Sequence, residues 1–90
     1  MAYIIDGEDL KRLVRMNFEE MKRVLKGKIN DIEYEESVDE NGELICSIYV
    51  YDKTISMTSI TCHKKGYNVH WGNSTTWDIK EEIQSIMGGE

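Results

Sequence analysis

The sequence predicts an α+β domain: an N-terminal helix, a four-stranded antiparallel meander and a C-terminal helix, with both helices on one face of the sheet. Two observations predict this fold. Apolar residues recur at helical spacing near both ends of the chain, whereas the middle alternates residue by residue in four segments. Short stretches rich in Asn, Asp, Gly and Lys separate these segments and are typical of turns. A chain of 90 residues is the size of one domain, so we predict a single domain over residues 1–90.

The first helix is expected at about residues 7–26, before a Gly27 that suits the position after a helix C-terminus. Its apolar stripe, at i, i+3, i+4 and i+7 spacing, consists of Leu10, Leu13, Val14, Phe18, Met21, Val24 and Leu25. Lys and Arg residues fill much of the other side. This amphipathic pattern predicts a helix that lies on the sheet.

The last helix is expected to begin near Ser74 or Thr75, because Thr75 and Asp78 have the spacing of a capping box. Its apolar stripe consists of Ile79, Ile83, Ile86 and Met87. Trp71 and Trp77 flank the start of this helix, and we predict core or edge packing for both.

The first turn sets the register between the first two strands. A two-residue Asn-Gly turn would put Glu33 opposite Val50 and mix carboxylates with apolar residues on a buried face, which is unfavourable. A three-residue loop over residues 40–42, with Gly42 in the left-handed conformation, puts Ile32 opposite Val50 instead. We therefore predict the three-residue loop.

Two further turns extend this register across the sheet. A tight Asp52-Lys53 turn would put Ile48 opposite Met57, and a three-residue Lys-Lys-Gly loop would put Thr61 opposite Val69. The solvent-facing side of the sheet would then present Asp31, Glu33, Glu35, Tyr49, Tyr51, Thr54, Ser56 and Thr58.

Charge is distributed unevenly along this acidic chain, whose formal net charge is −6. Residues 11–28 hold seven Lys and Arg against two Glu, whereas residues 31–43 hold seven Asp and Glu and no basic residue. The acidic balance disfavours direct binding to a nucleic-acid backbone. Either the two charged stretches are ordinary solvated surface, or the acidic one is a docking surface for a basic partner.

Tyrosines interleave with these carboxylates on the predicted open face, where Tyr49 lies opposite Glu33 and Tyr51 opposite Asp31. Tyrosine provides a large contact area at small entropic cost, which favours it at interfaces. The candidate partner-binding residues are Asp31, Glu33, Glu35, Glu36, Asp39, Glu40, Tyr49 and Tyr51.

Catalytic and metal motifs do not emerge from the cysteines and histidines. Cys46, Cys62, His63 and His70 lack the paired spacing of zinc ligands, so we expect no metal and no cofactor. Cys62 and His70 would lie on neighbouring strands of the open face, but a third group to orient the base is missing. We predict that the protein is not an enzyme.

The chain holds no apolar run long enough to span a membrane and no secretory signal at its N-terminus. Two cysteines are too few for a disulfide scaffold. We therefore expect a cytoplasmic protein with free thiols, without a membrane partner, that is a monomer or a homodimer.

In size, acidity and organisation the chain resembles small phage-encoded inhibitor proteins of the anti-CRISPR type, and the stretch Asp31-Ile32-Glu33-Tyr34-Glu35-Glu36 carries the resemblance. It implies an inhibitor that docks on a basic, nucleic-acid-handling surface of an effector, such as a CRISPR effector or a nuclease, in place of nucleic acid. Toxin-immunity proteins are similar in the same general way. An immunity protein for a nuclease toxin and a regulatory homodimer therefore remain alternatives.

Overall fold

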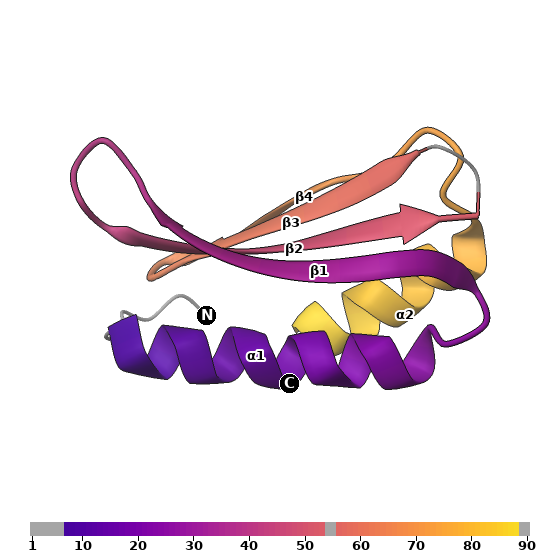
Figure 1. Cartoon of the computed structure of the whole chain (residues 1–90), viewed down its shortest axis with the longest axis horizontal. Coiled ribbons are helices and arrows are strands. Elements are labelled where there is room, and N and C mark those ends of the chain that lie inside the picture. Colours follow the sequence, from indigo (N-terminus) through magenta and orange to yellow (C-terminus); the bar gives the residue numbers. More distant parts are fainter. Residues whose placement is uncertain (1–6, 54–55, 89–90) are drawn as a thin grey trace.

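The computed structural model of the chain describes residues 7–53 and 56–88. The elements follow one another as α1 (Gly7–Val24), β1 (Ile29–Val38), β2 (Leu44–Asp52), β3 (Met57–His63), β4 (Gly66–His70) and α2 (Trp77–Gly88) (Figure 1). The four strands form an antiparallel sheet in the order β1-β2-β3-β4. The predicted α+β fold, a helix followed by a meander and a second helix, is confirmed.

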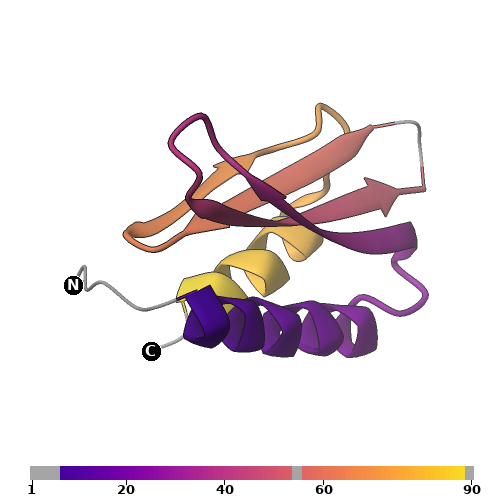
Figure 2. The same cartoon turned by 60° about the vertical axis from the view of Figure 1, so that its left-hand side comes forward.

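Both helices lie on one side of the sheet, and among the described residues no helix covers the other side (Figures 1 and 2). The core fills the space between the helices and the sheet. Its buried side chains are Leu10, Val14, Met21 and Leu25 of the first helix and its C-terminal turn, Cys46, Ile48 and Val50 of β2, Ile60 and Cys62 of β3, and Ile79 and Ile83 of α2. Phe18, predicted in the core stripe, is only partly buried and packs at 5.7 Å, centroid to centroid, from the Tyr34 ring.

The β1–β2 hairpin has the predicted three-residue loop. Gly42 has a φ of 79°, a left-handed conformation that suits glycine because it has no Cβ. Asp39 stabilises the loop, since its carboxylate accepts hydrogen bonds from the N–H groups of Asn41 (2.8 Å) and Glu43 (2.9 Å). Ile32 lies opposite Val50, as predicted.

The register between β2 and β3 was predicted wrongly. Ile48 lies opposite Ile60, not Met57, so Thr58 faces the helices. The turn is longer than expected: the Asp52 N–H donates to the Ser56 carbonyl oxygen at 3.3 Å. This register buries Ile60, and Thr54, also expected on the open face, lies outside the described residues.

Thr58 can be buried because its hydroxyl has partners. The Thr58 Oγ1 lies 2.9 Å from the Thr75 Oγ1 and accepts a hydrogen bond from the Gly72 N–H at 3.0 Å. A buried hydroxyl with satisfied hydrogen bonds costs little, so this position tolerates burial.

The β3–β4 turn also differs from the prediction. His63 pairs with Gly66 across a two-residue turn, and Val69 lies opposite Ile60 instead of Thr61. Each register error shifts the strand pairing by an odd number of residues, and an odd shift exchanges the two faces of a strand. The second error therefore reverses the effect of the first, and Val69 packs against the core as expected.

The start of α2 lies two to three residues later than predicted. Thr75 takes part in the hydrogen bond to Thr58 and does not begin the helix, whereas the Thr76 carbonyl accepts the first helical hydrogen bond from the Lys80 N–H at 3.1 Å. Trp71 packs against the core, but the prediction for Trp77 is wrong, because 69% of its surface is exposed.

Candidate functional site

The open face of the sheet brings five of the eight predicted residues together. Asp31 lies opposite Tyr51, and Glu33 lies opposite Tyr49, as predicted. Glu35 follows on the same face of β1, because side chains two residues apart point the same way. We call these five residues, Asp31, Glu33, Glu35, Tyr49 and Tyr51, the acidic face.

Two tyrosine hydroxyls tie this face together diagonally. The Tyr49 hydroxyl donates to the Glu35 carboxylate at 2.8 Å, and the Tyr51 hydroxyl donates to the Glu33 carboxylate at 3.2 Å. The hydrogen bond to Glu35 raises the pKa of Tyr49. Burial, followed by the negative charge of Glu33, raises the pKa of Tyr51. Both phenols are therefore neutral donors at pH 7, and both carboxylates are held in fixed directions above the sheet.

Glu36 points to the other side of β1 and belongs to a different cluster. Its carboxylate lies 3.2 Å from an Arg15 guanidinium nitrogen and 3.8 Å from the Lys11 Nζ, both on α1. The Tyr34 hydroxyl also donates to it at 2.8 Å. The hydrogen bond from Tyr34, with further contributions from Arg15 and Lys11, lowers the pKa of Glu36. This residue fastens α1 to β1 and is separated from the acidic face by the sheet.

The lowered pKa of Glu36 predicts a specific pH dependence of stability. The folded protein binds the Glu36 proton more weakly than the unfolded chain, so its contribution is complete above the ordinary value of 4.5 and disappears as pH falls through the lower folded value. We expect the urea midpoint of Glu36→Gln to fall less steeply than that of the wild type below pH 4.5. Glu40→Gln, in the exposed hairpin loop, should follow the wild-type profile, and equal slopes for all three proteins would contradict the assignment.

The other two predicted residues lie in the β1–β2 hairpin. Asp39 is engaged in the loop hydrogen bonds described above, so its carboxylate is structural. Glu40 is exposed beyond the end of β1. Neither belongs to the acidic face.

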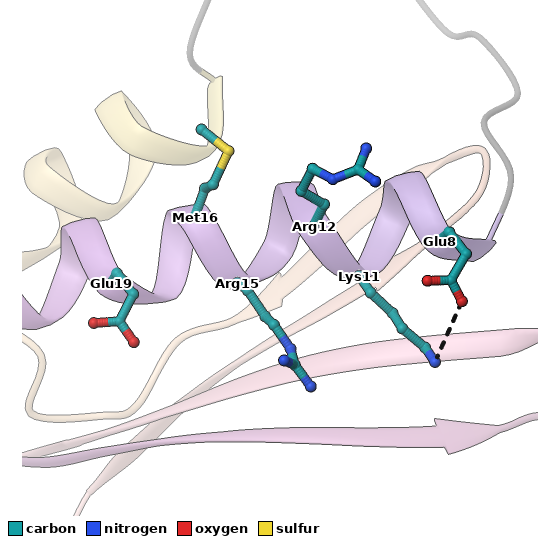
Figure 3. Close-up of a pocket in the computed structure, with 6 residues that line it drawn as sticks. All are labelled: Glu8, Lys11, Arg12, Arg15, Met16 and Glu19. Carbon is teal, nitrogen blue, oxygen red and sulfur yellow. Dashed lines mark ion pairs between the residues drawn. The ribbon is translucent and has the colours of Figure 1, made fainter.

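The basic side of α1 carries an open hollow lined by six residues of this one helix: Glu8, Lys11, Arg12, Arg15, Met16 and Glu19 (Figure 3). Lys11 and Arg15 extend on one side of it, and Arg12 and Met16 on the other (Figure 3). The three basic residues that line the hollow are paired with nearby carboxylates. Lys11 lies 3.9 Å from Glu8, Arg12 lies 2.8 Å from Asp9, and Arg15 lies 3.2 Å from Glu36. This pairing favours a solvated helix side over a phosphate-binding surface.

The acidic face continues into polar rows whose β3 residues the sequence reasoning missed. Glu33, Tyr49, Ser59 and His70 form one row across the four strands, and Glu35, Ser47, Thr61 and Asn68 form the next. The missed residues, Ser59 and Thr61, lie on β3, because the wrong β2–β3 register assigned Thr58 to this face; His70 of β4 lies on the open face, as expected. No local signal marks this side of β3, because each face of the segment offers both apolar and hydroxyl side chains.

The cysteines lie inside the protein. Cys46 and Cys62 are free, buried and directly opposite each other on β2 and β3, a pairing that the sequence reasoning did not anticipate. Burial raises the pKa of the Cys62 thiol to about 12, so it is protonated at pH 7. His70 lies opposite Ser59 on the open face. The expected placement of Cys62 with His70 on one face is therefore wrong.

Two searches of the described residues concern other classes of site. Within residues 7–53 and 56–88, no group of three or more His, Cys, Asp or Glu side chains is arranged to hold a metal ion. Neither α1 nor α2 has the length and apolar character needed to cross a membrane.

Comparison with known proteins gives no relative: no protein-family model, curated protein or solved structure matches the chain. The functional argument therefore depends on the geometry of the acidic face alone.

Proposed function

We propose that the protein is an inhibitor that binds another protein, and that its acidic face docks on a basic surface where the target normally holds nucleic acid. The target in this proposal is a nuclease or a CRISPR effector, as for phage-encoded anti-CRISPR inhibitors. The inhibitor itself has no catalytic role and acts in the cytoplasm, without direct contact to nucleic acid.

The observation that carries the proposal is the row of carboxylates held by tyrosine hydroxyls. Alternate residues of a strand are about 6–7 Å apart, an interval close to that between successive phosphates of a nucleic-acid strand. Hydrogen bonds from Tyr49 and Tyr51 fix the direction of Glu35 and Glu33, so less side-chain entropy is lost on binding. A fixed negative row beside two aromatic rings complements a groove of Lys and Arg.

Charge also argues against one of the alternatives, a regulatory homodimer. Two copies that met through the acidic face would form an isologous interface, in which each patch meets its own copy. Asp31, Glu33 and Glu35 of one copy would then face the carboxylates of the other. Such like-charge contact is destabilising, so the same feature that favours a basic partner opposes self-association.

The proposal is tested by competition. The immobilised protein is used to capture partners from a lysate of the source organism, and the captured protein is then purified and loaded with fluorescently labelled nucleic acid. We expect added inhibitor to release the nucleic acid, with an apparent affinity that weakens in proportion to the nucleic-acid concentration. A ternary complex, or a captured protein that does not bind nucleic acid, would contradict the proposed function.

A further inference from the structure

The outer edge of β1 is a second feature of the acidic region. In the described part of the chain β1 is the last strand on its side of the sheet, and it runs for 10 residues, against 5 for the opposite edge strand β4. Figures 1 and 2 show α1 beneath the sheet, so the helix lies below β1 rather than beside it. An edge strand of this length offers backbone groups for one more strand.

The hairpin shows which backbone groups point outward. The Asp39 N–H donates to the Glu43 carbonyl oxygen at 2.9 Å, so these two residues form a hydrogen-bonded pair. Hydrogen-bonded pairs alternate along an antiparallel ladder, so the odd-numbered residues of β1 bond to β2 and the even-numbered ones face away. The residues with outward N–H and C=O groups are Ile32, Tyr34, Glu36 and Val38. One outward N–H, that of Ile32, is already bonded to the Asp31 carboxylate at 2.8 Å.

The side chains indicate what kind of strand fits. On an added antiparallel strand, residues opposite Asp31, Glu33 and Glu35 would occupy non-hydrogen-bonded pairs, where cross-strand side chains come closest. Lys or Arg suits these positions. On the other face the Arg15 and Lys11 cations already surround Glu36, so an incoming cation there would be repelled. The complementary strand therefore alternates basic with uncharged residues.

A second copy of the chain does not meet this requirement. Pairing of β1 with β1 would bring four carboxylates of each copy, Asp31, Glu33, Glu35 and Glu36, alongside those of the other. Like charges opposite each other on a sheet are destabilising.

We propose that the β1 edge binds an extended segment of the target by strand addition, and that this segment alternates Lys or Arg with uncharged residues. The inference rests on the proposed function, because it uses the carboxylates of the acidic face. It adds that the backbone of β1 makes part of the contact, so recognition requires hydrogen bonding as well as charge.

The test uses a short acetylated and amidated peptide in which Lys alternates with Val, with binding followed by NMR. We expect binding to slow hydrogen exchange at the Tyr34 and Glu36 amides, which face outward. The Glu33 and Glu35 amides, already bonded to β2, should change little. Two matched peptides with equal charge separate the effects: N-methylation of the Val residues removes the donors that face β1, whereas N-methylation of the Lys residues removes donors that face away.

We expect the Val-methylated peptide to bind at least tenfold more weakly and the Lys-methylated peptide to keep its affinity within about threefold. Equal affinity of the two methylated peptides, or no binding of the parent peptide, would overturn strand addition and leave the proposed docking of a folded basic surface standing. The protein variant Glu33→Gln/Glu35→Gln tests whether the carboxylates of the acidic face contribute to peptide binding. If it binds the parent peptide as tightly as the wild type, recognition by the acidic face fails, and the proposed function with it.

Discussion

Ile48→Ala should lower the free energy of unfolding by about 2–5 kcal/mol, the usual cost of removing a large aliphatic side chain from a buried site. Ile48 is fully buried at the centre of the sheet, with Tyr34 opposite it on one side and Ile60 on the other. Its neighbours are held by backbone ladders on both sides, so they cannot easily close the cavity. Domains of this size have a total stability of only about 5–15 kcal/mol, so the variant should lose a large share of its stability and melt at a clearly lower temperature.

The matched control for this prediction is Ile45→Ala, because it removes the same atoms from the same strand. Ile45 lies on the open face and is only partly buried, so its loss should cost about 1 kcal/mol. Both values are measured by urea unfolding followed by tryptophan fluorescence. Equal losses for the two variants would show that β2 does not bury the face that contains Ile48.

The β1–β2 half of the sheet was predictable from the sequence because its alternatives differ strongly in energy. Of a two-residue and a three-residue loop, only the three-residue loop keeps Glu33 and Glu35 off the face of Ile48 and Val50, so burial of charge rejects the shorter one. Gly42 supplies the left-handed residue that this loop needs. Local turn chemistry and long-range burial agree here, and this agreement made the acidic face predictable residue by residue.

The β2–β3 register was not predictable in the same way, because its two candidate faces are similar in polarity. Met57 and Ser59 alternate with Thr58 and Ile60, so each face offers one apolar and one hydroxyl side chain. What decides between them is the pair of hydrogen bonds that joins the Thr58 hydroxyl to the Gly72 N–H and the Thr75 hydroxyl, in the segment that leads into α2. That contact joins residues 14 and 17 positions apart, and no local pattern shows it.

In the candidate site, too, local patterns were predictable and contacts with a distant element were not. Alternation placed Asp31, Glu33 and Glu35 together correctly, but a count of charge in a stretch cannot separate Glu36 from its neighbours. The role of Glu36 follows from Lys11 and Arg15, which come from a different element. The acidic stretch of the sequence therefore contains carboxylates in two different positions: Glu36 holds α1 on the sheet, and the carboxylates of the acidic face point to solvent.

Reversal of two charges on the acidic face, Glu33→Lys/Glu35→Lys, should lower the rate of association with the captured target by about 10–1000-fold at low salt. The reversal changes the charge of residues 31–43 from −7 to −3, and both side chains are exposed, so the fold should persist. The wild-type rate should fall as salt is added, whereas the rate of the variant should change little. The control Glu19→Lys/Glu81→Lys makes the same change in net charge on α1 and α2, and it should retain most of the wild-type rate.

Tyr49→Ala should change the dissociation rate rather than the association rate. Tyr49 is half-buried between the carboxylates, so loss of its ring removes contact area and should raise the dissociation rate by a factor of about 30 or more, equivalent to roughly 2 kcal/mol, with little dependence on salt. Tyr49→Phe keeps the ring but removes the hydrogen bond to Glu35, so its dissociation rate should lie between those of the wild type and Tyr49→Ala. These rates are measured by surface plasmon resonance across a salt series. If the acidic-face variants bind like the wild type while Glu19→Lys/Glu81→Lys fails, the contact lies on the helices, and the acidic face is ordinary solvated surface.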